Sequence, residues 1–254
     1  MISKNTIRFM SSLQNKKARD GENMFVIEGE KTVREFLEAG MHLRVLAATA
    51  EFISTLPAHA LKQVERVETA GPAELKQMSS LTTPNSAIAA LDRFCNAAPG
   101  LPQNLTVALD CIQNPGNLGT IIRAAAWFGI GSVVCSRDCV DVYNPKVIQA
   151  SMGALLHVTV GYVELVEYIK NATANSFPVY GTMLAGNSIY SQPLGASGII
   201  LLGNESKGIS VKLAPFITHK ILIPGVHSEL PGIDSLNAGM AASIIFSEFY
   251  RRSL

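Results

Sequence analysis

Polar residues that could do chemistry gather in three short turns, of which the first reads IQNPGNLG and spans Ile112 to Gly119. This turn leads into an expected helix over residues 117–128, for which Asn117 is a favourable N-cap. At about 100° per residue, Arg123 points roughly 150° away from the centre of an apolar stripe on that helix. The stripe consists of Leu118, Ile121, Ile122 and Ala125. An arginine so placed must meet solvent, another chain or a phosphate.

The second turn, Leu201–Ser210, reads LLGNESKGIS and places Glu205 and Lys207 between two glycines. Glycines alone do not make it a phosphate-binding loop. The chain has no G-x-x-x-x-G-K-[ST] motif and no G-x-G-x-x-G after any expected strand. The sequence therefore disfavours a P-loop protein and a nucleotide-dependent dehydrogenase.

The third turn follows Ile223 and leads into the final helix, expected over residues 235–252. Ser235 is the expected N-cap of this helix, with Asn237 in its first turn. The helix sequence AGMAASIIF is apolar on nearly every side, so we expect the helix to be buried. A buried terminal helix in a domain of modest size indicates a subunit interface or an unusually threaded chain.

The three turns need a scaffold, and apolar strands alternating with helices supply it over residues 105–254. This alternation predicts a parallel sheet covered by helices on both faces. Ligands bind at the carboxyl ends of strands in such sheets, which is where all three turns fall. The expected strands are residues 105–112, 131–136, 178–184, 198–203 and 220–225, and a further helix begins at Pro145.

Residues 1–95 form a separate α/β unit, joined to the rest by a linker over residues 96–104 that is rich in small residues, proline and glycine. Its expected strands are residues 24–29, 43–49 and 86–92. Apolar residues at helical spacing predict a helix after the first strand, with Gly40 as its stop. The composition of this unit alone does not indicate a chemical function.

The composition sets outer limits on the class of protein. The chain has 254 residues, 48% of them apolar, and a net charge of +1, which disfavours disorder and a global basic field for nucleic acid. The first nineteen residues nevertheless carry five basic side chains and no acidic one, as a solvated tail or a phosphate-contacting segment would.

The cysteines and the apolar runs of the sequence indicate the cellular compartment of the protein. The four cysteines and five histidines show no metal-ligand spacing, so we expect no metal and a reduced chain. No apolar run is long enough for a membrane span, and the sequence MISKNTIRFM lacks the apolar core of a signal peptide. These features predict a soluble, cytoplasmic protein.

In their order and internal spacing, the three turns resemble the motifs of the SpoU (TrmH) family of RNA ribose 2′-O-methyltransferases, within the SPOUT class. The matches are Asn117 and Arg123 for N-x-x-x-x-x-R, Gly203, Glu205 and Gly208 for G-x-E-x-x-G, and Ile223-Pro224 followed by Ser235-Leu236-Asn237 for the third motif. The segment FVIEGEKTVREFLEAG is similar to the ribosomal-protein-like substrate-binding domain of many members, so the likeness covers nearly the whole chain.

The resemblance implies an α/β fold with a C-terminal parallel-sheet SPOUT domain, which contains a deep trefoil knot, and a small N-terminal α/β ribosomal-protein-like domain. It implies that S-adenosyl-L-methionine is the cofactor and is held in the knot mainly by backbone groups, without a metal. The positions matching the family's cofactor contacts are Gly203, Ile223 and Leu236. Family members are homodimers in which an arginine crosses the interface, and this would explain why Arg123 points away from its own core.

The resemblance also assigns catalytic positions, namely Asn117, Arg123, Glu205, Ser235 and Asn237. A ribose hydroxyl is a poor nucleophile and a sulfonium methyl a strong electrophile, so orientation can supply much of the rate. Because a guanidinium rarely gives up its proton, we expect Arg123 to clamp the neighbouring phosphate and the developing alkoxide. Ser235 and Asn237 would orient the ribose. Asn117 would fix the substrate or Arg123, and Glu205 would order its loop or pair with Arg123.

One departure from the family pattern is the segment GVHSELPGID between Pro224 and Ser235, which is longer than usual. It falls in the cofactor loop and could alter cofactor contacts or substrate choice. Large ribosomal RNA is the first expected substrate and transfer RNA the second. Methylation of an RNA base, a non-catalytic RNA-binding relative and a small-molecule transferase remain as alternatives.

Overall fold

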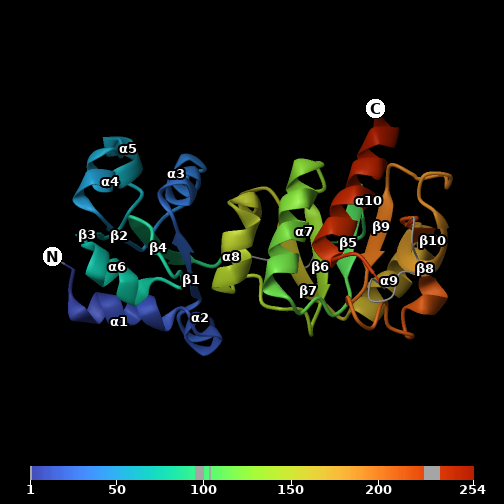
Figure 1. Cartoon of the computed structure of the whole chain (residues 1–254), viewed down its shortest axis with the longest axis horizontal. Coiled ribbons are helices and arrows are strands. Elements are labelled where there is room, and N and C mark those ends of the chain that lie inside the picture. Colours follow the sequence, from blue (N-terminus) through green and yellow to red (C-terminus); the bar gives the residue numbers. More distant parts are fainter. Residues whose placement is uncertain (1, 95–99, 103, 226–234) are drawn as a thin grey trace. The chain divides into compact units, whose positions relative to one another are not determined.

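The computed structural model describes residues 2–94, 100–102, 104–225 and 235–254, and the chain divides into two compact units (Figure 1). The first unit combines the chain up to Cys95 with residues 143–156, and the second contains the remainder. Residues 143–156, which the sequence places in the C-terminal domain, thus pack within the first unit. Tyr143 shows why: its ring lies 4.6 Å from that of Phe25, and its hydroxyl donates to the Phe94 carbonyl at 2.8 Å.

The first unit is built on a four-stranded sheet in the order β1-β4-β2-β3. Strand β4 runs antiparallel to both of its neighbours, while β2 and β3 are parallel. The strands of the first unit are β1 (Met24–Glu28), β2 (Val45–Ala48), β3 (Val67–Thr69) and β4 (Ala87–Asp92). Its helices are α1 (Lys4–Ser12), α2 (Lys16–Glu22), α3 (Glu30–Glu38), α4 (Ala50–Ser54), α5 (Ala58–Leu61), α6 (Pro72–Met78) and α8 (Pro145–Ser151), with a 3₁₀ turn at Ala154–Leu156.

The basic N-terminal run is folded, so the prediction of a solvated tail is wrong. It forms α1 and α2, which are capped by the side chains of Ser3 and Asn15. Met10 and Leu13 anchor the segment because both are fully buried. Arg19 is also buried and donates to the Leu13 and Gln14 carbonyls at 3.1 and 2.9 Å. The interspersed apolar residues therefore decide the structure of this segment, against its charge.

The second unit contains a parallel sheet, as predicted, and its six strands lie in the order β10-β8-β9-β5-β6-β7. The strands are β5 (Leu105–Leu109), β6 (Ser132–Ser136), β7 (Thr159–Val163), β8 (Val179–Ser188), β9 (Gly198–Leu202) and β10 (His219–Leu222). Edge strand β7 is the one that the sequence analysis did not predict. The helices are α7 (Pro115–Trp127), α9 (Leu165–Ala174) and α10 (Ala238–Ser253), with a 3₁₀ turn at Ala214–Phe216.

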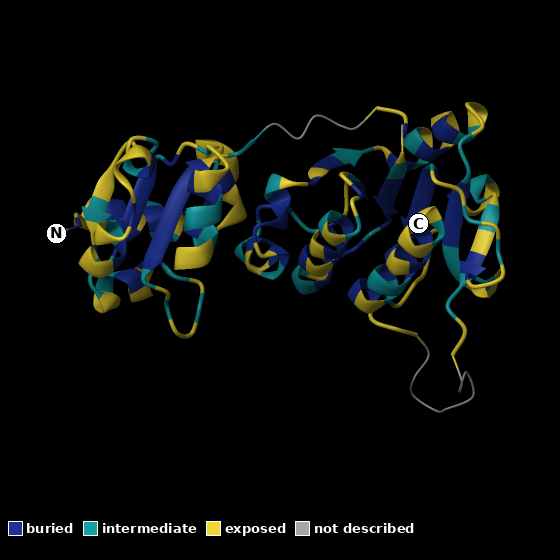
Figure 2. Cartoon of the chain, turned by 90° about the horizontal axis from the view of Figure 1, so that it is seen from above, coloured by how far each residue is buried: buried dark blue, intermediate teal, exposed yellow. Residues whose placement is uncertain are grey.

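Helices cover both faces of the parallel sheet. On one face, Leu165 and Ile169 of α9 pack against Ala108, Val134 and Leu201 of the central strands. Side chains alternate between faces along a strand, so the neighbours of these residues point to the other side. There α7 and α10 lie side by side (Figure 1), and the central strands β5, β6 and β9 are almost entirely buried (Figure 2).

Helices α7 and α10 pack closely through small residues. A side chain at Gly239 would place its Cβ 2.8 Å from Cγ2 of Thr120, so only glycine fits there. Against the expected all-round burial of α10, Met240 and Tyr250 are 58% and 47% exposed. Among the residues that the structure describes, no helix is long and apolar enough to span a membrane.

Candidate active site

Helix α7 begins at Pro115, and its N-cap is Asn114 rather than the predicted Asn117. The Asn114 side-chain oxygen accepts a hydrogen bond from the Gly116 amide at 2.8 Å. Proline suits the first helical position because it has no N–H to satisfy and its φ is already helical. The cap therefore falls three residues earlier than expected. Asn117 itself is 8% exposed, and its side-chain amide is not used for capping and can make tertiary contacts.

The start of α10 shows the reverse shift. Asn237 is the N-cap in place of the predicted Ser235, and its side-chain oxygen accepts from the Gly239 and Met240 amides at 3.0 and 3.3 Å. Ser235 lies ahead of the helix and is exposed. Its hydroxyl is consequently not used for capping.

A chain of side-chain hydrogen bonds connects the three turns. Asn237 Nδ2 donates to Asn117 Oδ1 at 2.8 Å, and Asn117 Nδ2 donates to the Glu205 carboxylate. The orientation of both amides is fixed, because Asn237 Oδ1 serves the helix and a carboxylate only accepts. The bonds therefore run in one direction, from the N-terminus of α10 to Glu205. Aligned hydrogen bonds of this kind strengthen one another.

The second turn is fixed by Asn204 and Gly203. Asn204 Oδ1 accepts from the Ser206 and Lys207 amides, while its Nδ2 donates to the Cys111 carbonyl at 2.9 Å. A Cβ on Gly203 would lie 2.3 Å from the Gly208 carbonyl carbon, so the turn accepts no side chain there. These contacts hold the turn against the segment that follows β5.

A cavity of about 560 Å³ opens between the second and third turns at the carboxyl ends of β8, β9 and β10. Gly203, Ile223 and Leu236, the predicted cofactor positions, all line it, together with Glu205 and Ser235. Its volume falls within the range of about 300–1,000 Å³ typical of small-ligand sites. The remaining lining is largely apolar and comes from Thr182, Met183, Leu184, Ala185, Ile189, Leu202, Asn204, Ser206, Lys207, Gly208, Ile209, Ile221, Leu222, Ala238, Ala241 and Ile245.

Arg123 lies apart from this assembly. Its side chain is exposed, as the helical spacing predicts, and it makes no hydrogen bond or ion pair with the described residues. Of the two roles expected for Glu205, the pairing with Arg123 is not found among the described residues, and Glu205 accepts from Asn117 instead. The structure thus brings together Asn117, Glu205 and Asn237 and leaves Arg123 facing solvent.

Sequence reasoning missed Asn114, Asn204 and the wall that β8 contributes. The Asn-Pro pair at the start of α7 was the available signal for Asn114, whereas Asn204 had only its place before Glu205. The segment between Pro224 and Ser235 also forms part of the predicted site, but all of it except Gly225 lies outside the described residues.

A thiol near the site does not provide a nucleophile. Burial raises the pKa of Cys111 to about 11, so the thiol stays protonated at neutral pH. The Ser136 hydroxyl holds the pKa of the neighbouring Asp138 below its ordinary value. In the described part of the chain, no group of three His, Cys, Asp or Glu side chains could hold a metal ion.

A parallel sheet with a cavity at its carboxyl edge, two motif turns that line the cavity and a third that Asn117 joins to them define a methyltransferase domain of the SPOUT class. A model of the SpoU rRNA Methylase family matches residues 104–247, more than half of the chain, and the protein belongs to this family. A model of the MRM3-like substrate binding domain matches residues 4–89.

Relatives match both units together. The chain is 27% identical to the 23S rRNA guanosine 2′-O-methyltransferase RlmP of Bacillus subtilis, covering 94% of this chain and 93% of that one. It is also 27% identical to mouse mitochondrial rRNA methyltransferase 3, over 96% of this chain and 71% of the relative. A solved structure from Porphyromonas gingivalis, assigned to the TrmH family of RNA methyltransferases, is 37% identical with a TM-score of 0.86, covering 99% of each chain. An AdoMet-bound rRNA methyltransferase from Sinorhizobium meliloti shares the fold at 24% identity, with a TM-score of 0.85 over 100% of this chain and 97% of that one.

Proposed function

We propose that the protein transfers a methyl group from S-adenosylmethionine to a ribose 2′-hydroxyl of structured RNA, with ribosomal RNA as the preferred class. The observation that carries this proposal is the joining of three motif turns, by the hydrogen bonds of Asn117, beside one cavity. The names of the relatives support it, because RlmP acts on a ribose 2′-oxygen of ribosomal RNA.

The cavity suits a nucleoside with an attached amino acid. Its aliphatic lining offers a flat apolar group a dry surface, while the backbone of the second and third turns offers donors and acceptors. Gly203 lets the second turn close tightly at the cavity, because its missing side chain leaves room for the backbone of Gly208. Bound there, S-adenosylmethionine supplies an electrophilic methyl group. Gly203, Ile223 and Leu236 would hold it, in a trefoil knot that includes the third turn.

The polar residues orient the acceptor. Ser235, whose hydroxyl is not used for capping, and Asn237 hold the ribose at the edge of the cavity. Asn117 and Glu205 keep Asn237 in place, so the oxygen is aligned before reaction. Arg123 clamps the adjoining phosphate and stabilises charge that develops on the oxygen.

A homodimer supplies Arg123 to the site of the other subunit. Exposed apolar side chains support this arrangement, because Trp127 at the end of α7 is 84% exposed and Met240 and Tyr250 project from α10. An isolated chain leaves these groups in water, whereas a second copy would cover them. The first unit binds and positions the RNA, in the cytoplasm.

The test is label transfer. The full-length protein is incubated with methyl-labelled S-adenosylmethionine and unmodified ribosomal or transfer RNA, which is then digested to nucleosides. Label on a 2′-O-methyl nucleoside from ribosomal RNA is the expected result. Label on transfer RNA alone would change the substrate class, and label on a base would overturn ribose specificity. Cofactor binding without transfer to either RNA would indicate a non-catalytic RNA-binding protein or another acceptor.

A further inference from the structure

The wall of the cavity includes a short turn at the end of β8. Ile189, the first residue after the strand, is fully buried and lines the cavity. Its backbone amide donates to the Leu222 carbonyl at 2.8 Å, which joins the turn to the end of β10. Leu222 and Ile245 line the same cavity. The position of this turn therefore sets the shape of the apolar wall.

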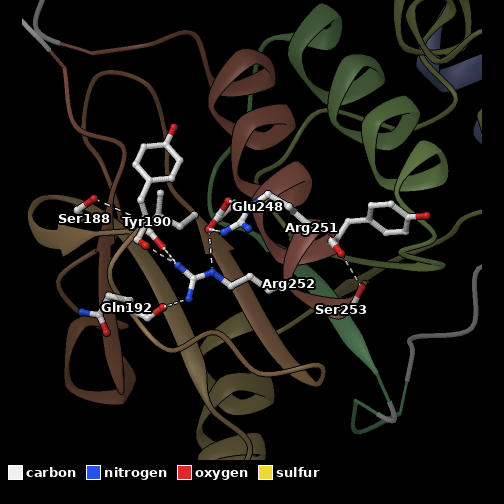
Figure 3. Close-up of polar contacts among 9 residues, drawn as sticks. Ser188, Tyr190, Gln192, Glu248, Arg251, Arg252 and Ser253 are labelled. Carbon is white, nitrogen blue, oxygen red and sulfur yellow. Dashed lines mark hydrogen bonds and ion pairs between the residues drawn. The ribbon is translucent and has the colours of Figure 1, made fainter.

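Arg252, near the C-terminal end of α10, donates hydrogen bonds to backbone carbonyl groups of this turn (Figure 3). Its Nη2 donates to the carbonyls of Ile189 and Tyr190 at 3.1 and 2.6 Å, and its Nη1 donates to that of Gln192 at 2.7 Å. Three backbone acceptors outside any helix or strand ladder are thus satisfied by one guanidinium. Hydrogen bonds to a charged donor are stronger than neutral ones, and the planar fork limits the turn to one geometry.

Glu248, one turn earlier on α10, orients that guanidinium. Its Oε1 accepts from Arg252 Nε at 2.7 Å, and its Oε2 accepts from Arg251 Nε at 2.8 Å (Figure 3). Only 6% of the Glu248 side chain is exposed, so solvent competes little for these contacts. Arg251 and Arg252 lower the pKa of Glu248 to about 2, which keeps the carboxylate charged.

The same helix reaches the cavity directly. Ala238, Ala241 and Ile245 line it from the N-terminal half of α10, and Arg252 lies at the C-terminal end. At about 1.5 Å per residue, a distance of roughly 10 Å along the helix separates Ile245 from Arg252. One rigid element thus contributes part of the wall and also fixes the neighbouring part.

We propose that Arg252, oriented by Glu248, is a positioning residue for S-adenosylmethionine binding: it holds the 189–192 turn so that Ile189 keeps its place in the cavity wall. This inference rests on the proposed function of the cavity. Without Arg252, three carbonyls would turn towards water and release the backbone of Ile189. The affinity for the cofactor would then fall although no group that contacts it has been changed.

Arg252→Met and Arg252→Lys test the inference, with Arg251→Met as the matched control. Arg251 pairs with the same carboxylate, but its side chain is 64% exposed and makes no contact with the turn. The dissociation constant of S-adenosylmethionine is measured by calorimetry on full-length protein, below the unfolding temperature of each variant. We expect it to rise about tenfold in Arg252→Met and less in Arg252→Lys, and to stay within about twofold in Arg251→Met, which corresponds to under 0.5 kcal/mol.

Hydrogen exchange of the turn separates positioning from stability. Backbone amides over residues 188–192 should exchange faster in Arg252→Met, while the central strands keep their protection. A lower unfolding temperature with wild-type cofactor affinity and wild-type exchange in the turn would overturn the inference. If the wild-type protein itself fails to bind S-adenosylmethionine, the proposed function fails. Faster exchange of the turn in Arg252→Met would still establish that Arg252 holds it.

Discussion

The first turn of α7 and the position of Arg123 further along that helix differ in how their polar groups are paired. Asn117 uses both ends of its amide within the chain, and Asn237 joins it to a helix terminus. Arg123 has no such partner among the residues described, and it faces solvent. The geometry of the first region therefore exists before any ligand binds. On the proposed function, the partner of Arg123 is an RNA phosphate.

Arg123→Ala should separate the two regions most strongly. On the proposed function, kcat/KM for RNA falls by about 10²–10³, the usual cost of losing one preorganised group that stabilises transition-state charge. The unfolding temperature and the cofactor dissociation constant should stay unchanged, since the side chain supports no described contact. Label transfer and thermal unfolding measure these quantities. Lys170→Ala, which removes an exposed charge from α9, is the control and should retain full activity. Retention of more than about a third of wild-type activity in Arg123→Ala would contradict its role.

Asn117→Ala, unlike Arg123→Ala, should lower both the stability of the fold and the affinity for the cofactor. Glu205 would lose a donor and Asn237 an acceptor, so the free energy of unfolding should fall by about 1–3 kcal/mol. Cofactor affinity should also weaken, because Glu205 lines the cavity. Denaturant titration and calorimetry measure the two effects. The exposed Asn171 of α9 provides a control, and Asn171→Ala should leave both unchanged. Equal stabilities of Asn117→Ala and wild type would show that the network adds nothing to the fold.

The acid stability of α10 provides the smallest expected effect. Glu248 has a folded pKa of about 2 against an ordinary value of 4.5, so its carboxylate stabilises the fold fully above pH 4.5. That contribution is lost as the pH falls from 4.5 towards 2, where the folded carboxylate becomes protonated. Glu248→Gln should show a shallower loss of stability over this interval. Denaturant titrations across it measure the difference, and parallel pH profiles of wild type and variant would rule the linkage out.

Local patterns were sufficient for five of the six strands of the parallel sheet and for helices α7, α8 and α10. Continuous apolar runs predicted β5, β6, β8, β9 and β10, and the apolar stripe of α7 predicted that Arg123 is exposed. Both patterns depend only on the period of a strand or helix, which neighbouring residues determine. Strand β7 escaped because its sequence TVGYV is short and interrupted by Gly161.

Details of the site depended on competition between neighbours. Asn114 and Asn117 are both good caps, and Pro115 decides between them by favouring the first helical position. Asn237 likewise takes the cap from Ser235. Contacts such as Arg252 with the 189–192 turn join residues about sixty positions apart, so no local pattern could indicate them. The folding of the basic N-terminal segment was not predicted, because its charges received more weight than the spacing of Met10 and Leu13.

The discontinuous first unit has a consequence for protein engineering. Tyr143 and helix α8 pack on β1 and Phe94, although the chain reaches them only after passing through two strands of the parallel sheet. A chimaera that exchanges the substrate-binding domain at residue 95 would therefore pair a foreign sheet with native residues 143–156. A domain exchange should include both segments, so that the aromatic contacts between them are kept. The first unit must therefore be transferred as a whole, although its two segments are separate in the sequence.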